Sequence, residues 1–250
     1  MISHYIIMSS SYKDGVRIAI DITKKEMINK ETISGILQKI ESICGIGVPL
    51  STHFISTESV SWESVSTYDP FFKGVKLIDT VEDFATTIEK SRHLSGMDVA
   101  NYILSKLRCT HLSLEKLVYF AYADYLCSFS EPLFQDRIYA FRHGPIIESV
   151  YEIYKRSGYQ DVEPHYQQDE LIECKKDEMP FKSRILFARD GEEKLCSIDK
   201  TIEKYGSYTA RQLVDLTHKS GSPWSMVDST QPYQLISDDI IKNYHHVETV

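Results

Sequence analysis

One run of the sequence is apolar or aromatic around most of its circumference when it is wound as a helix. The run begins at Ser113 and continues LEKLVYFAYADYLCSF, and Lys116 and Asp124 are its polar exceptions. A helix that is apolar on nearly all sides must be covered by neighbouring elements on several sides. The sequence therefore predicts a buried central helix here, and we interpret its aromatic residues, Tyr119 included, as core packing.

Further helical patterns surround this run in the second half of the chain. A capping sequence opens the stretch 95–107, whose apolar residues recur at helical spacing. The stretch 195–205 has the same spacing, and residues 209–212 have the residue types of a capping box. A last short helix is expected at 238–244. The second half is thus predicted to be mostly helical.

A third helix is predicted from the stretch FRHGPIIESVYEIYK at 141–155. Gly144 gives the chain freedom at the cap, and the ring of Pro145 already holds the φ angle of a first helical residue. Arg142 and His143 would then lie at the positive end of the helix, where they could bind a carboxylate or carbonyl of another protein. In the alternative interpretation, Arg142 pairs with an acidic residue of its own domain and His143 only packs.

The first half of the chain has a mixed pattern. Strand-like and helix-like stretches alternate along it in the order β-α-β-β-α, at 16–22, 32–45, 53–62, 72–79 and 81–90. Such an order suits a small domain with helices over a sheet. The predicted fold class is therefore α+β, with a small N-terminal α/β module at 1–94 and a mostly helical domain at 95–250. The polar stretch 158–184 is predicted to be a loop or a short hairpin.

The composition of the chain indicates where the protein is located and which kinds of partner it can bind. The formal net charge of −8 does not favour a nucleic-acid partner, because affinity for the phosphate backbone comes from concentrated Lys and Arg. No stretch approaches the roughly 18 apolar residues that a membrane span needs. Five scattered cysteines, with no CxxC pair, are typical of reduced thiols: Cys44, Cys109, Cys127, Cys174 and Cys196. We predict a cytoplasmic protein.

The usual signatures of enzymes and metal sites are missing from the sequence. The glycines form neither a dinucleotide-binding nor a P-loop pattern, and no GxSxG or HExxH occurs. The histidines and cysteines do not have the spacing of a metal-ligand set. The sequence therefore predicts no catalytic residue, no cofactor and no metal.

Four ordered blocks of the sequence resemble a known family. They read MDVANYILSKL (97–107), LSLEKLVYFAYADYL (112–126), PLFQDRIYAFRHGPIIESVYEIYK (132–155) and QLVDLTHKSGSPW (212–224). Together they resemble the Panacea domain, also called the SocA-like antitoxin domain or phage-associated GepA-like family, over about residues 95–230. The resemblance implies a mostly helical domain that does not catalyse a reaction and neutralises a neighbouring toxin of a type II toxin–antitoxin pair by binding it.

Other functions remain open beside this one. Some members of the family act as adaptors that deliver the toxin to a protease, so a host protease is a second expected partner. A phage-encoded inhibitor of a host protein would use the same binding mode, and an enzyme with a site between the two modules is a further alternative. An acidic antitoxin would be steered toward a basic toxin, which we take as a hypothesis.

The family motifs also define candidate contact residues. We interpret His218 as a cap on its helix end and Trp224 as a plug at the edge of the helical core, with partner contact as the alternative for each. The full set of candidate partner-contact or family-motif residues is Lys116, Tyr119, Arg142, His143, Pro145, Thr217, His218, Pro223 and Trp224.

Overall fold

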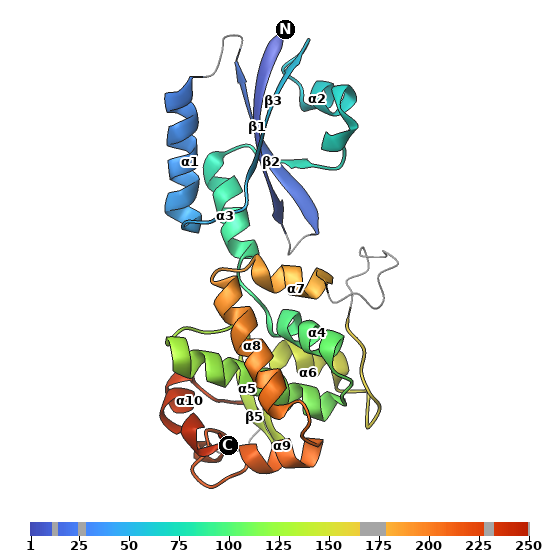
Figure 1. Ribbon diagram of the computed structural model, residues 1–250, viewed down its shortest axis with the longest axis vertical. Coiled ribbons are helices and arrows are strands. Elements are labelled where there is room, and N and C mark those ends of the chain that lie inside the picture. Colours follow the sequence, from blue (N-terminus) through green and yellow to red (C-terminus); the bar gives the residue numbers. More distant parts are fainter. Residues whose placement is uncertain (12–14, 25–28, 166–178, 228–232, 250) are drawn as a thin grey trace. The chain divides into compact units, whose positions relative to one another are not determined.

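The chain forms two compact units, Met1–Arg92 and His93–Val250 (Figure 1). A computed structural model describes residues 1–11, 15–24, 29–165, 179–227 and 233–249. The first unit contains a four-stranded sheet with helices, and the second is mostly helical. The predicted α+β class is therefore confirmed.

The N-terminal unit is built on a mixed sheet in the strand order β3-β1-β2-β4. Strand β1 is antiparallel to both β2 and β3, whereas β2 and β4 are parallel. Its elements are β1 (Ile2–Ser11), β2 (Val16–Lys24), α1 (Lys30–Cys44), β3 (Ser51–Thr57), α2 (Trp62–Tyr68), a 3-10 helix (Pro70–Phe72), β4 (Lys76–Leu77) and α3 (Val81–Ser91).

The two faces of this sheet are covered by different helices (Figure 1). Because successive side chains of a strand point to opposite faces, Ile7 packs with α1 and α3, while Ile6 and Met8 pack with α2 and the segment after it. Strand β2 divides in the same way, with Ile18 and Ile20 on one face and Ala19 on the other. The sheet is thus buried on both sides.

The sequence-based order of this unit needs two corrections. Strand β1 was not predicted, although it is the central partner of β2 and β3. Its residues from Ile6 to Ser9 are buried on both faces, so they lack the alternation by which a half-buried strand is recognised. The stretch 53–62 was predicted as one strand, but the strand ends at Thr57 and Ser61 caps α2 by accepting a hydrogen bond from Ser64 N.

The second unit is arranged around one long helix. Its elements are α4 (Gly96–Lys106), α5 (His111–Phe129), β5 (Ile138–Phe141), β6 (Gly144–Ile147), α6 (Glu148–Tyr154), α7 (Met179–Leu186), α8 (Gly191–Tyr205), α9 (Ala210–Thr217), a 3-10 helix (Trp224–Met226), β7 (Gln234–Leu235), α10 (Asp238–Tyr244) and a second 3-10 helix (His245–Val247). Helix α5 contacts α4, α8, α9 and α10 (Figure 1). It is buried from Ser113 to Ala123, which confirms the predicted central helix.

The predicted helix with Gly144 at its cap and Pro145 as its first residue is wrong in its first turn. Gly144–Ile147 forms strand β6, which pairs with β5 so that Phe141 faces Gly144 and Ala140 faces Pro145. Helix α6 begins only at Glu148. Pro145 is tolerated because β6 is an edge strand of the order β6-β5-β7, where a missing N–H need not break a ladder. Arg142 and His143 therefore form the turn of a β-hairpin.

The polar stretch 158–184 also differs from its prediction. Residues 166–178 lie outside the described part of the chain. The last residues of the stretch belong to α7, where Arg184 pairs with Asp98 of α4 at 3.1 Å between Nη2 and Oδ2. The predicted loop is wrong for this segment.

Candidate functional site

The hairpin β5–β6 is held at its turn by two aromatic side chains from the C-terminal part of the chain. Trp224 Nε1 donates to the carbonyl oxygen of Phe141 at 2.7 Å. His218 Nε2 lies 3.3 Å from the carbonyl oxygen of Arg142, and the His218 and Trp224 rings contact each other at 3.7 Å between centroids. The backbone on the first side of the turn is thus fixed by side chains.

The second side of the turn is held by a buried lysine. Lys116 of α5 is 0% exposed and its Nζ donates to the carbonyl oxygen of Pro145. Gly144 adopts φ 101°, and a Cβ at this position would lie 2.7 Å from Thr217 Oγ1 and 2.9 Å from Lys116 Cε. Only glycine allows this close approach, because other residues have both the wrong φ preference and an extra atom.

A buried glutamate completes the contacts to β6. Glu115 accepts a hydrogen bond from Ile147 N through Oε2 at 2.9 Å, and its Oε1 lies 3.1 Å from His111 Nε2. Lys116 and Glu115 are adjacent in sequence, and both are almost fully buried in α5. The hairpin is therefore attached to the central helix through one cation and one anion.

A second buried network lies further along α5 and involves the C-terminal segment. Tyr119 donates its hydroxyl to Glu248 Oε2 at 2.9 Å, and the same oxygen lies 2.9 Å from His245 Nδ1. The other ring nitrogen, Nε2 of His245, lies 2.9 Å from Asp124 Oδ1. When Asp124 and Glu248 are both ionised, each ring nitrogen can only donate, so His245 is a protonated imidazolium in this arrangement.

Burial and charge shift the pKa values of these groups. Burial would lower the pKa of His245, but the hydrogen bonds and charges of Asp124 and Glu248 raise it to about 8. Burial lowers the pKa of Lys116 to about 8, against the opposing charges of Glu115 and Glu248. Burial raises the pKa of Glu248, which His245 and Tyr119 partly offset. The network thus contains buried charges that compensate one another.

The side chains at the tip of the hairpin point outward. Arg142 and His143 are both exposed. No ion pair joins Arg142 to a residue that the structure describes, so the predicted pairing with an acidic residue is not observed there. Tyr233, 59% exposed, packs against Phe141 with ring centroids 5.4 Å apart. We call Phe141, Arg142, His143 and Tyr233 the hairpin-tip surface.

The structure brings most of the candidate residues around one hairpin, but in two different roles. Arg142 and His143 are exposed, while the others lie behind them as supports or in the core. His218 also caps α9, with Nδ1 2.8 Å from the carbonyl oxygen of Val214, as predicted. Tyr119 and Pro223 are buried, so their side chains support the fold. The partner-contact role of all these residues stays a prediction.

Sequence reasoning did not find the acidic and C-terminal members of the network. Glu115, Asp124, His245 and Glu248 are separated by up to 133 positions, and no spacing rule joins them. The indication in the sequence was that Lys116 and Asp124 interrupt an otherwise apolar helix, and the adjacent Glu115 was not singled out. A charge on such a helix must find a partner, and the structure shows which one.

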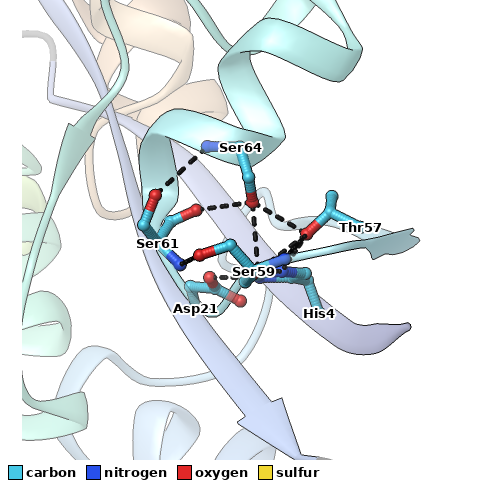
Figure 2. Close-up of polar contacts among 6 residues, drawn as sticks. All are labelled: His4, Asp21, Thr57, Ser59, Ser61 and Ser64. Carbon is cyan, nitrogen blue, oxygen red and sulfur yellow. Dashed lines mark hydrogen bonds and ion pairs between the residues drawn. The ribbon is translucent and has the colours of Figure 1, made fainter.

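A separate polar cluster lies in the N-terminal unit (Figure 2). His4 Nδ1 lies 2.7 Å from Asp21 Oδ2, and its Nε2 lies 3.0 Å from both Thr57 Oγ1 and the carbonyl oxygen of Ser59. Thr57 Oγ1 donates to that carbonyl at 2.7 Å. A carboxylate, an imidazole and a hydroxyl in this order resemble a hydrolase triad. Here, however, His4 and Thr57 are buried, and the cluster fastens three strands and the turn after β3.

Burial raises the pKa of Asp21, while the hydrogen bond and charge of His4 lower it in part. The other carboxylate oxygen, Oδ1, is buried and has no hydrogen-bond partner among the residues described. Within that same part of the chain, no group of three or more His, Cys, Asp or Glu side chains is placed to hold a metal. Nor does any helix described there combine the length and apolarity that crossing a membrane requires.

Comparison with known proteins finds a family that part of the helical unit resembles. Residues 114–225 match the family model described as "Antitoxin SocA-like, Panacea domain". This part of the chain is therefore similar to a Panacea domain of the SocA-like type, which confirms the resemblance predicted from its sequence blocks. The matched range begins in α5 next to Glu115 and ends just after Trp224, so it includes the hairpin and its supports.

One curated relative is similar over most of its own length. It is the protein named Antitoxin SocA of Caulobacter vibrioides (strain NA1000 / CB15N), 28% identical over 162 residues, which cover 61% of this chain and 82% of the relative. No solved structure matches the chain.

Proposed function

We propose that this protein is the antitoxin of a type II toxin–antitoxin pair and neutralises a protein toxin by binding it directly. The observation that supports the proposal most is the match of residues 114–225 to the SocA-like antitoxin domain. The similarity to a relative named as an antitoxin supports the same role. On this proposal the protein covers its partner and catalyses no reaction itself.

The hairpin-tip surface is the proposed point of contact with the toxin. Arg142 and His143 are exposed, yet the carbonyls of Phe141 and Arg142 are both held by side chains from behind. A loop that is already ordered loses little conformational entropy when it binds. Arginine and aromatic residues are also the types that most often contribute large binding energies at interfaces.

The toxin is proposed to be basic. The chain has a formal net charge of −8. Charge of this sign speeds the encounter with a basic protein, and dissolved salt screens the attraction. The association rate with the toxin should therefore fall as the salt concentration rises. An association rate that is independent of salt concentration would count against this part of the proposal.

The test of the function is co-expression with the reading frame adjacent to its gene. We expect that frame to stop growth when it is expressed alone, and this protein to restore growth and to copurify with its product. If the neighbouring frame is harmless and a host protein copurifies instead, the protein is an inhibitor or adaptor of a host target. Rescue without copurification would contradict neutralisation by direct binding.

A further inference from the structure

Strand β3 is an open edge of the N-terminal sheet. It pairs with β1 on one side, and no other strand of the described chain pairs with it. The opposite edge is formed by β4, which has only two residues, one of them the exposed Lys76. Short edge strands and edge lysines prevent pairing with other chains, so the β4 edge is protected.

The β3 edge has none of these protections. Its seven residues read STHFIST and include no charge, no proline and no glycine. Ser51, Thr52 and Phe54 are exposed, and Phe54 is 57% exposed although it lies in the middle of the strand. A neutral strand rich in aromatic and β-branched residues, with free backbone groups along one side, is a template for pairing with another strand.

The strand is also fixed in place before any partner arrives (Figure 2). His4 joins Asp21 of β2 to Thr57 at the end of β3. Ser64 Oγ lies 2.7 Å from Thr57 Oγ1 and also donates to the carbonyl oxygen of Ser59 at 3.1 Å, which holds the turn that leaves the strand. A partner strand would meet an ordered edge, and little entropy would be lost on pairing.

The sequence of β3 is self-complementary about its centre. Reversed on itself, STHFIST places phenylalanine against phenylalanine, histidine against isoleucine, and hydroxyl residues against hydroxyl residues at both ends. In a two-fold interface residue i of one copy meets residue j of the other, and j meets i, so each of these pairs would occur twice and only Phe54, on the axis, would meet its own copy. No like charges would meet along the strand.

We propose that β3 pairs antiparallel with β3 of a second copy of this chain, with the two-fold axis between the two Phe54 residues. The two sheets then continue as one, and the chain is a homodimer through its N-terminal unit. This inference goes beyond the proposed antitoxin function and does not depend on it, because it concerns the unit outside the matched domain.

Charge substitution at Phe54 in the full chain tests the pairing. In Phe54→Glu and in Phe54→Lys, two like charges would face each other across the axis, and like charges directly opposite destabilise a strand pair. We expect the mass in solution, measured by light scattering after size-exclusion chromatography, to fall from two chains to one in each variant. An equimolar mixture of the two variants should form the dimer again, because the opposed charges then attract.

Tyr68→Glu is the matched control, because Tyr68 is 70% exposed and lies in α2, outside the strand that would pair. It should remain a dimer. A wild-type chain that stays monomeric at every concentration would overturn the proposal, as would a dimer that survives both Phe54 variants.

A measurement on the unaltered chain does not depend on how the variants fold. Amide hydrogen exchange in residues 51–57 should slow as the protein concentration is raised, since the edge amides become bonded in the dimer. Exchange that is independent of concentration, or that slows only when another protein is added, would contradict self-pairing.

Discussion

Lys116 is the residue on which the attachment of the hairpin depends most. It is fully buried, donates to Pro145 O and lies near the carboxylates of Glu115 and Glu248. Removal of one member of a buried set of charges leaves the others uncompensated. We expect Lys116→Met to lower the free energy of unfolding by about 3 kcal/mol, measured by urea denaturation.

The control for this variant is Lys200→Met, since Lys200 is an exposed lysine of α8. Its effect should stay within about 0.5 kcal/mol. If Lys116→Met were as stable as the wild type, the buried lysine would not be needed to compensate the carboxylates.

His245 makes stability depend on pH in a defined window. Its pKa is raised from 6.5 to about 8 in the folded chain by Asp124 and Glu248, against the effect of burial. The folded state therefore holds this proton more tightly than the unfolded state does. The resulting stabilisation, about 2 kcal/mol, is complete below pH 6.5 and is lost as the pH rises through about 8.

Urea denaturation at several pH values between 6 and 9 measures this loss. The lowered pKa of Lys116, about 8, makes stability rise with pH, but only above pH 8. The change in stability between pH 6.5 and 8 therefore reports on His245. His246→Gln, at the exposed neighbouring residue, should keep the pH dependence, whereas His245→Gln should remove it. Equal slopes in the two variants would show that another group is responsible.

At the scale of elements, long periodic helices could be predicted and short strands could not. Helix α5, the N-cap at Ser95 and the capping box at Thr209 follow from local spacing, and the structure contains all three. The hairpin could not be derived in this way, because Gly144 and Pro145 fit both a helix start and an edge strand. The hairpin is selected over a helix start by contacts from Trp224, His218 and Lys116, which are distant in sequence and hold the turn.

Strand β1 shows the same limit in the N-terminal unit. Its inner residues are buried on both faces of the sheet, so the pattern is a continuous apolar run. A short run of this kind does not distinguish a strand from a buried helix. Only pairing with β2 and β3 identifies it, and pairing is a property of the folded chain.

Gly144 is the position at which the hairpin tolerates change least. Gly144→Ala must accommodate both a φ of 101° and a Cβ that is 2.7 Å from Thr217 Oγ1. We expect a loss of about 3 kcal/mol in the free energy of unfolding, measured by urea denaturation, together with weaker toxin binding.

Gly158→Ala separates strain from crowding, since Gly158 has a φ of 61° but open space around it. That variant should lose only about 1 kcal/mol and should bind the toxin normally. Equal losses in the two glycine variants would mean that contact with Thr217 and Lys116 does not matter.

At the scale of the whole molecule, the two units have separate cores and, on the present account, separate roles. The matched domain and the hairpin-tip surface lie in His93–Val250, while the open strand edge lies in Met1–Arg92. A fragment 93–250 should therefore fold and neutralise the toxin in the co-expression assay. The fragment 1–92 should not, and neutralisation that requires both units would contradict this division.

The charge balance of the whole chain was available from the sequence, as was the resemblance to the antitoxin domain. The candidate contact residues could be predicted from the sequence only in part. Sequence blocks pointed to Arg142, His143 and their supports without showing which were exposed, because exposure of the tip results from the hairpin and its anchors. The open edge at β3 was not foreseen, since it requires the strand order of the sheet.

The most direct test of the account is the affinity of the purified full chain for the toxin when charge is reversed at the hairpin tip. Arg142→Glu should weaken binding by about 30-fold or more, the loss expected for an interface residue worth at least 2 kcal/mol. Arg211→Glu, the same change at an exposed residue of α9, should leave the affinity nearly unchanged. Equal affinities for Arg142→Glu and the wild type would show that the toxin binds elsewhere.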